Sequence, residues 1–407
     1  MTDELVHSQS SGGASGTTAA PAQAPKLVDP IEGVDIEKEG LSDGIALCLS
    51  GGGSRAMLFH LGALWRLNDA RLLGKLDRVS SVSGGSIMAG ILAKAWSGLG
   101  FDDSGFAGGF GTQVVEKTRE FANETIDVGA LGRGVFLPGS AADQLVSALR
   151  HHLYGDTTLQ DLPDRPRFVI NATNLQSTVL WRFSKPYAGD YMVGRLDQPK
   201  IPLAVAVAAS SAFPPFFSPV ALKTEGSTFL PLDGETLTTP EYRERVLLAD
   251  GGVYDNLGLE TAYKRYRTLL VSDGGGKTKP DDSPATDWIQ QPIRIMSIMD
   301  NQVRSLRKRM LINAYLTGER NGTFWGIRTN IADYRLEENG LEAPLLAPHE
   351  KTMVLAELPT RLAAVEERMQ EALINWGYAV CDAGLRRHVD GSIRRPADFP
   401  YPSVGVG

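Results

Sequence analysis

Residues 45–67, with the sequence IALCLSGGGSRAMLFHLGALWRL, decide the fold of this chain. Ile45–Leu49 is a continuous apolar run, which is typical of a β-strand buried on both faces. Gly51–Gly53 follow almost at once, and glycines suit a tight turn. From Ala56 to Leu67 the chain is apolar nearly all round and contains no proline, which predicts a buried helix. A strand, a glycine turn and a helix in this order indicate the start of a βαβ unit.

The next segments repeat the alternation of strand and helix. Asp77–Ser83 has the composition of a second strand, and Ile87–Trp96 has that of a second helix. Strands that alternate with helices predict an α/β protein with a parallel sheet and crossover helices. We expect later strands in short apolar runs at Phe168–Ala172, Val246–Leu248, Leu269–Val271 and Ile293–Ile298.

One large folded domain is expected to fill most of the chain. Residues 1–42 contain a stretch of Ser, Gly, Ala, Thr, Pro and Gln without large apolar side chains, which predicts a disordered N-terminal tail. No linker-like break follows, so we expect one catalytic domain over residues 43–390, with helical insertions, and a C-terminal tail over 391–407. Apolar residues recur every three or four positions over Leu358–Trp376, which predicts an amphipathic helix.

The composition argues against several classes of protein. The 407 residues include 41 Lys and Arg and 48 Asp and Glu, a net charge of −7, so nucleic-acid binding is not expected. Two cysteines, Cys48 and Cys381, cannot build a disulfide framework or a cysteine-rich zinc site. The sequence opens without a secretory signal pattern, and prolines and serines interrupt the uncharged run Ile201–Leu222, which favours buried core over a membrane span. We therefore expect a soluble cytoplasmic protein, with or without peripheral membrane contact.

A candidate nucleophile lies in the turn Ser81-Val82-Ser83-Gly84-Gly85, between the second predicted strand and the second predicted helix. A serine at a sharp strand-to-helix turn is the pattern of a nucleophile elbow, whose neighbours two positions away must be small. Gly85 meets this requirement, whereas Ser81 stands where glycine is more usual. The pattern favours Ser83 as a nucleophile, and a glycine-rich turn without chemistry is the alternative.

The glycine turn is a candidate anion site. Gly51-Gly52-Gly53-Ser54-Arg55 places successive backbone N–H groups at a helix N-terminus, where such groups bind an anion. No Gly-Lys-Ser/Thr follows, and Ala56 replaces the third glycine of a dinucleotide motif, so a nucleotide phosphate is disfavoured. The oxyanion of an acyl-transfer intermediate fits better. Three roles stay open for Arg55: it could fix the loop, meet a lipid phosphate, or pair with a nearby carboxylate.

A histidine base for Ser83 has weak support in the sequence. His60 lies within the predicted buried helix and is expected to be a hydrogen-bonded core residue. A triad of Ser83, Asp250 and either His349 or His388 is compatible with the order of the residues, but both histidines lie in polar stretches.

A carboxylate base has better support, and two candidates compete for the role. Asp250 ends an apolar strand and precedes Gly251 and Gly252. Asp273 also ends an apolar strand and precedes the glycines 274–276. Because the carboxyl ends of strands collect near the edge of a parallel sheet, either residue is locally suited to meet Ser83 there.

In this order the motifs resemble those of the patatin-like phospholipase family, over roughly residues 44–300. The resemblance rests on a glycine-rich oxyanion loop, an elbow, an aspartate motif and a further block, namely Gly51–Arg55, Ser81–Gly85, Asp250–Gly252 and Ala209–Pro214 with 217–220 after it. The residues at 253–258, VYDNLG, are similar to those that follow the family's aspartate, which favours Asp250 over Asp273. Ser81 and Ala56 depart from the family pattern.

The resemblance implies a three-layer α/β/α fold around a mostly parallel sheet, and a serine lipid acyl hydrolase with a Ser83–Asp250 dyad. It implies oxyanion binding by the N–H groups of Gly52, Gly53 and Gly84, in a loop shaped by Gly51. A phospholipid or lysophospholipid is the implied substrate, and neither a cofactor nor a metal is implied.

A different class of function stays open. The chain could be a catalytically silent module that binds lipid or a partner protein, and its basic stretch Arg304, Arg307, Lys308 and Arg309 could then meet anionic head groups. An activated serine would distinguish the enzyme from such a module. The sequence does not predict an oligomeric state.

Overall fold

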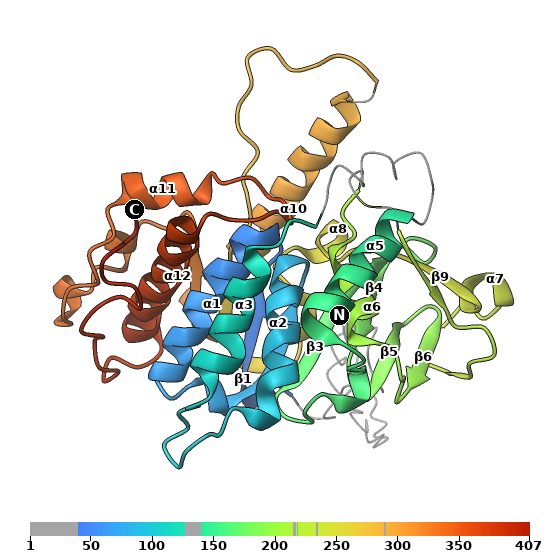
Figure 1. The fold of residues 1–407 in the computed structure, drawn as a ribbon, viewed down its shortest axis with the longest axis horizontal. Coiled ribbons are helices and arrows are strands. Elements are labelled where there is room, and N and C mark those ends of the chain that lie inside the picture. The colour runs from blue at the N-terminus through green and yellow to red at the C-terminus, as the bar shows by residue number, and fades with distance from the viewer. Residues whose placement is uncertain (1–39, 127–139, 215–216, 218, 233–234, 289) are drawn as a thin grey trace, which may run out of the picture.

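The computed structural model describes residues 40–126, 140–214, 217, 219–232, 235–288 and 290–407 (Figure 1). The predicted N-terminal tail, residues 1–42, lies almost wholly outside the described residues. In chain order the strands are β1 (Ser42–Leu49), β2 (Leu76–Ser81), β3 (Arg167–Asn174), β4 (Leu180–Phe183), β5 (Tyr187–Asp190), β6 (Gly194–Asp197), β7 (Val220–Lys223), β8 (Phe229–Leu230), β9 (Arg245–Asp250), β10 (Tyr266–Asp273) and β11 (Asn321–Gly326). The α-helices are α1 (Gly53–Asp69), α2 (Gly84–Ala95), α3 (Glu116–Ala122), α5 (Ser140–Leu149), α6 (Leu203–Ser211), α7 (Pro240–Arg243), α8 (Gly252–Asp255), α9 (Glu260–Tyr263), α10 (Gln290–Leu316), α11 (His349–Ala356) and α12 (Glu367–His388).

The strands form one sheet with a parallel centre. β11, β10, β1, β2 and β3 lie side by side in this order, and each neighbouring pair is parallel. Beyond β3 the sheet continues with antiparallel pairs through β4, β5, β6 and β8. The predicted parallel sheet with crossover helices is confirmed, and the antiparallel extension is an addition to it.

Helices cover both faces of the parallel centre. β1 alternates between two apolar clusters, as a strand buried on both faces must. Leu47 and Leu49 face the cluster that contains α1, α2 and α12, whereas Ala46 and Cys48 face a smaller cluster with Leu311 of α10. The result is the three-layer α/β/α arrangement seen in Figure 1, where α1, α2 and α12 lie on the near side of the sheet.

The helix after the first glycine turn is buried as predicted, and it packs closely on α12. A Cβ at Gly62 would lie 1.9 Å from the Ile374 carbonyl oxygen, and a Cβ at Gly377 would lie 1.9 Å from that of Phe59. Only glycine permits this backbone contact. The predicted C-terminal amphipathic helix exists, but it begins at Glu367 and not at Leu358, because the Glu366 side chain caps it by accepting from two backbone N–H groups.

One predicted strand is wrong. Ile293–Ile298 belongs to α10, which runs from Gln290 to Leu316. The short run alternates enough to suggest a strand, but apolar residues continue at helical spacing through Met299, Val303 and Leu306, so the longer window favours a helix.

Two other segments show how the remaining chain is used. Ile201–Leu222 is divided between α6, which is largely buried, and the sheet strand β7. Among the described residues, no helix combines the length and apolar character needed to cross a membrane. Residues 391–407, which the sequence predicts as a tail, pack on the body through Val406, and Tyr401 contacts the Trp65 ring.

Candidate active site

Ser83 stands in a strained turn between β2 and α2. Its backbone has φ of 52° and ψ of −123°, a conformation that non-glycine residues rarely adopt. Such strain persists only where the surrounding structure enforces it, and it clusters at functional sites. The turn is the elbow that the sequence predicts. Ser81 is accommodated at the unusual position because its hydroxyl accepts a hydrogen bond from the Ser86 hydroxyl at 3.0 Å.

The glycine loop lies directly against this elbow. A Cβ at Gly84 would come within 2.3 Å of the Gly53 carbonyl oxygen, and a Cβ at Gly51 would come within 3.1 Å of the Ser83 Cβ. Gly53 and Gly84 are the first residues of α1 and α2, where N–H groups have no acceptor within the helix. The structure thus brings two helix N-termini to one place beside Ser83.

The loop residues differ in what their backbone groups do. Gly51 N–H already donates to the Asn256 carbonyl at 3.1 Å, so it holds the loop to the segment after β9. Ser54 N–H donates to the Arg361 carbonyl at 2.9 Å, which joins the start of α1 to a distant part of the chain. Asn256 and Arg361 are therefore supporting residues that the motif alone does not reveal.

Asp250 lies at the same edge of the sheet, but the sequence does not predict the direction of the strand that places it there. β9 is antiparallel to β3, with Asp250 opposite Ala172, whereas β3 is parallel to β2. Ala172 lies beyond Ile170, the partner of Ser81 at the end of β2. Because β9 runs antiparallel to β3, it runs back toward the carboxyl end of β2. Its last residue, Asp250, therefore lies near the turn that contains Ser83.

The Asp250 carboxyl is buried and is held on one side only. It is 2% exposed, and its Oδ1 accepts the Gly252 N–H at 2.7 Å. Burial raises the pKa of Asp250 to about 7, because the charged form loses its hydration, and the nearby Asp300 carboxylate of α10 adds a smaller rise. The nearby Ser83 hydroxyl offsets part of this rise in pKa. Among the described residues, the Oδ2 atom of Asp250 has no hydrogen-bond partner.

Ser210, at the end of α6, joins the elbow to the aspartate turn. Its carbonyl oxygen accepts the N–H groups of Ser83 at 3.1 Å and Gly251 at 3.3 Å. Its hydroxyl lies 3.0 Å from the Ser83 nitrogen and 2.9 Å from the Ser86 hydroxyl. The sequence points to the block Ala209–Pro214 only through the family resemblance, and it indicates no role for Ser210. A serine in a small-residue block before the aspartate motif was the available signal.

Arg55 fixes the loop, which was one of its three open roles. Its side chain is buried, and its guanidinium donates to the Gly274 carbonyl at 3.2 and 3.3 Å and to the Leu358 carbonyl. Burial, with the nearby Arg328 and Arg304 charges, lowers the pKa of Arg55 to about 10. The side chain therefore ties the glycine loop to the turn after β10.

The histidines have other surroundings. His60 is the buried core residue that the sequence predicts, with Nδ1 2.8 Å from the Ser272 hydroxyl and Nε2 2.9 Å from the Ser50 carbonyl oxygen. Burial lowers the pKa of His60 to about 4. His349 begins α11, and the ring of His388 lies beside that of Tyr334. Within the described part of the chain, no recorded contact joins His349 or His388 to Ser83 or Asp250.

The fold and the place of these residues define a class of protein: a three-layer α/β protein with its polar site where buried strands end and two helices begin. The model of one family, described as Patatin-like phospholipase, matches residues 47–263, more than half of the chain. The chain therefore belongs to the patatin-like phospholipase family. This membership supports lipid hydrolase activity. A search among curated proteins found no match.

Solved structures resemble the chain at low sequence identity. Human GIVD cytosolic phospholipase A2 in complex with methyl gamma-linolenyl fluorophosphonate aligns with a TM-score of 0.46 at 16% identity, over 84% of this chain and 57% of that chain. VipD from Legionella pneumophila aligns with a TM-score of 0.34 at 15% identity, over 85% of this chain and 67% of that chain. The chain thus spans little more than half the length of the human phospholipase.

Proposed function

We propose that this protein is a lipid acyl hydrolase that cleaves fatty-acyl esters with a Ser83–Asp250 dyad. The observation that carries the proposal is a strained serine facing a buried carboxyl whose pKa is about 7. An ordinary carboxylate, with a pKa of about 4, is a weak base for a serine hydroxyl. A carboxyl whose pKa lies near neutrality is better matched to general-base work at neutral pH.

The proposed reaction passes through a covalent acyl-enzyme. Asp250 takes the hydroxyl proton as Ser83 Oγ attacks the ester carbonyl, and the carbonyl oxygen becomes an oxyanion. The alcohol product leaves with a proton from Asp250 as the ester C–O bond breaks. Water, deprotonated by Asp250, then attacks the acyl-Ser83 ester and releases the fatty acid. The N–H groups of Gly52, Gly53 and Gly84 stabilise the oxyanion in each half-reaction, and loss of one such donor typically costs about 3–4 kcal/mol.

The substrate class follows from the family. A phospholipid or a lysophospholipid is proposed, because the chain belongs to the patatin-like phospholipases and carries the family's motifs in order.

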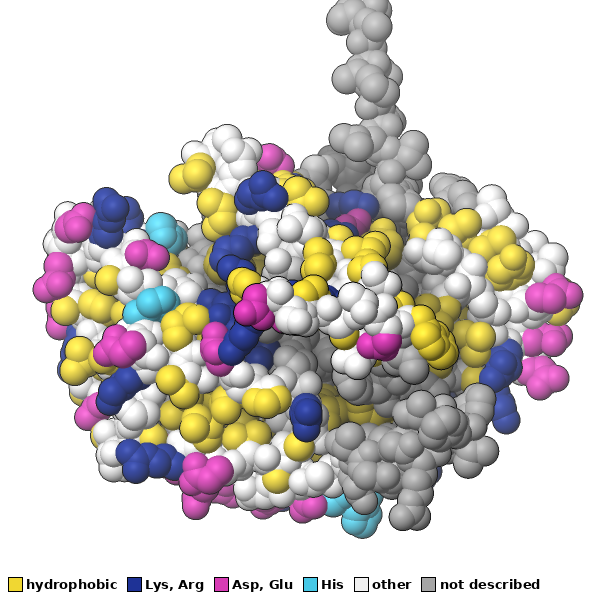
Figure 2. All heavy atoms as spheres, turned by 90° about the horizontal axis from the view of Figure 1, so that it is seen from above, with side chains coloured by type: hydrophobic (Ala, Val, Ile, Leu, Met, Phe, Trp, Pro, Cys, Tyr) yellow, Lys and Arg dark blue, Asp and Glu magenta, His cyan; other side chains and the backbone are white. Residues whose placement is uncertain are grey.

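Contact with a bilayer is proposed for the face that carries α10. Figure 1 shows α10 projecting from the body, and Figure 2 shows hydrophobic side chains beside Lys and Arg side chains on this face. Large apolar side chains on and just before α10 are exposed: Trp288, Ile295, Met296, Ile298, Met299, Val303, Leu306, Met310 and Leu316. Apolar and basic side chains together suit the surface of an anionic membrane. Arg307 of the same helix donates to the Tyr254 carbonyl at 3.5 Å, in the segment just after Asp250, so this helix lies near the proposed active site.

Covalent labelling tests the dyad. A fluorophosphonate probe should label the wild type and fail to label Ser83→Ala, because only an activated serine reacts. His349→Ala and His388→Ala are matched controls that should label at the wild-type rate. Labelling that persists in Ser83→Ala would contradict the dyad, and loss in a histidine variant would favour the triad. A folded wild type that is never labelled would favour the non-catalytic module.

Sedimentation with vesicles tests the bilayer contact. The wild type should bind phosphatidylglycerol vesicles, and Ile295→Glu with Met299→Glu should bind them at least about tenfold more weakly, since charges are poorly tolerated in the apolar boundary. Val354→Glu is the control, because Val354 is about as exposed as Met299 but lies on α11. Equal losses in both variants would contradict docking through α10.

A further inference from the structure

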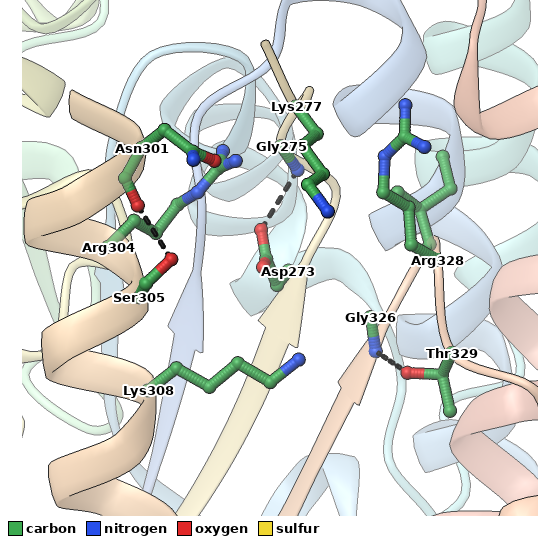
Figure 3. Close-up of a pocket in the computed structure, with 11 residues that line it drawn as sticks. Asp273, Gly275, Lys277, Asn301, Arg304, Ser305, Lys308, Gly326, Arg328 and Thr329 are labelled. Carbon is green, nitrogen blue, oxygen red and sulfur yellow. Dashed lines mark hydrogen bonds between the residues drawn. The ribbon is translucent and has the colours of Figure 1, made fainter. Parts of the chain in front are cut away.

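A second polar cavity lies where β10 and β11 end. Its volume is about 230 Å³. The loop after β10, the middle of α10 and the segment after β11 form its walls (Figure 3). We call it the basic pocket and define it by five charged side chains in its lining: Asp273, Lys277, Arg304, Lys308 and Arg328.

The positive charges of the basic pocket exceed its negative charge. Four of the five side chains are cations, and Asp273 is the one carboxylate that lines it. Within the described part of the chain, Lys277, Arg304 and Lys308 form no ion pair within 4 Å, and Arg328 has Glu357 at 3.7 Å. The pocket therefore has an excess of positive charge.

Lys308 is a partly buried cation. Partial burial lowers the pKa of Lys308, and the Asp273 carboxylate raises it by more than the neighbouring Arg304 charge lowers it. The Lys308 ammonium lies 4.1 Å from the centre of the Phe324 ring. In Figure 3 the Lys277 and Lys308 side chains extend into the space between α10 and the end of β11. An anion bound between them would offset the cost of partly burying the Lys308 charge.

The chemistry of the lining suits a phosphate group. Arginine presents several N–H donors in a planar fork, and lysine supplies a compact point charge, which together match the oxygens of a phosphate. Ser305 and Thr329 add hydroxyl groups to the lining. The Ser305 hydroxyl donates to the Asn301 carbonyl at 2.7 Å, and the Thr329 hydroxyl accepts the Gly326 N–H at 3.1 Å. The Thr329 hydroxyl can therefore still donate its own hydrogen to a ligand.

The pocket lies behind the glycine loop. The Gly274 carbonyl, in the loop that bounds the pocket, accepts two of the three Arg55 hydrogen bonds. It also lies so near Gly52 that a Cβ on Gly52 would meet the Gly274 carbonyl oxygen at 2.8 Å. A group bound in the basic pocket would therefore be close to the proposed oxyanion site and separate from it.

We propose that the basic pocket binds a phosphate group. The phosphate could come from two sources: the head group of the lipid substrate or a free phosphate monoester. The first source rests on the proposed function, and the second does not.

Binding measurements test the pocket without reference to catalysis. Inorganic phosphate and glycerol 3-phosphate are titrated into the full-length Ser83→Ala protein by calorimetry at low salt. Lys308→Gln and Lys277→Gln should each weaken binding roughly tenfold, the size expected for one charged hydrogen bond. Asp273→Asn should tighten it, because the carboxylate repels the anion.

Neighbouring cations supply the matched controls. Arg309 follows Lys308 on α10, and Lys279 follows Lys277 two residues later in the loop. Neither Arg309 nor Lys279 lines the pocket, so Arg309→Gln and Lys279→Gln are the controls. Each control removes the same charge and should change affinity less than about twofold. Absence of saturable binding, equal losses in the controls, or weaker binding by Asp273→Asn would overturn the proposal.

Kinetics then distinguish the two sources. If the head group binds in the pocket, Lys308→Gln raises KM for phosphatidic acid severalfold and leaves KM for the neutral ester p-nitrophenyl butyrate unchanged. If the ligand is a free phosphate monoester, KM for both substrates stays unchanged while the binding loss remains. A protein that hydrolyses neither substrate but binds phosphate with the expected pattern would refute the proposed function and support the pocket with a free ligand.

Discussion

Asp250 and Asp273 stand in the same kind of turn and have different surroundings. Each ends a buried strand and precedes glycines, and the Oδ1 of each accepts the N–H two residues later, at 2.7 Å in Asp250 and 3.0 Å in Asp273. Asp250 is buried beside the Ser83 hydroxyl, whereas Asp273 is half-buried among the cations of the basic pocket. The local motif determines the turn, and the packing around it determines what the carboxyl can do.

The largest expected difference between the two turns is in activity. Asp250→Asn should lower kcat for p-nitrophenyl butyrate about 10⁴- to 10⁶-fold, the range found when a serine triad loses its aspartate or its base. Asp273→Asn should lower it less than about tenfold, because its carboxyl lines the basic pocket and accepts the Gly275 N–H. Steady-state rates with both folded variants check this. Similar losses would mean that the two turns are not functionally distinct.

The pH dependence of activity sharpens the comparison. If Asp250 is the base, its unprotonated form is required, so kcat/KM should rise about tenfold per pH unit below 7 and level off above it. Asp300→Asn should shift the midpoint to lower pH, because the Asp300 charge contributes to the raised pKa of Asp250. A wild-type midpoint near 4 would show that the carboxyl is hydrated and would remove the physical basis of the dyad.

The smallest expected effect is on stability, and its sign differs between the turns. The folded-state pKa of Asp250, about 7, exceeds the unfolded value near 3.9, so the folded protein binds more protons between these values. Its contribution to stability is therefore present at low pH and is lost as pH rises toward 7 and above. Asp250→Asn should raise Tm at pH 8 by a few degrees, and the gain should shrink toward pH 5.

Asp273→Asn should change Tm at pH 8 in the opposite direction, because it removes the one carboxylate among the cations of the pocket. Thermal unfolding followed by circular dichroism measures both variants. A stabilising Asp273→Asn would mean that its carboxylate does not offset those charges.

The sequence predicts the parts of this molecule that depend on local rules. β1, α1 and the turn from β2 to α2 follow from apolar runs, glycines and small neighbours within a few positions of each other, and the structure confirms these elements. The pairing of β9 with β3 and the contacts of Ser210 with the elbow depend on partners more than sixty residues away, so no local pattern indicates them. The error at Ile293–Ile298 has a different cause, since the helical spacing is local but becomes visible only when the window extends through Met299, Val303 and Leu306.

The two aspartates show the same limit within the site. Local sequence treats Asp250 and Asp273 as equals, and only the family's residues after Asp250 separate them. The two carboxyls differ physically in how many apolar atoms surround them and in which charges lie nearby. Both properties arise only when the chain folds. The roles of Ser83 and Asp250 themselves stay predictions until the variants are measured.

The hydrogen bond from Ser54 to Arg361 has a consequence for where the independently folding unit ends. The family match stops at residue 263, yet the first turn of α1 is hydrogen-bonded to Arg361. Further along, α1 packs on α12 where Gly62 and Gly377 allow close backbone contact. A protein truncated at residue 263 would keep every motif of the family. It would lose Arg361 and α12, which hold α1 and therefore the glycine loop in position. The shortest competent fragment should therefore extend through His388.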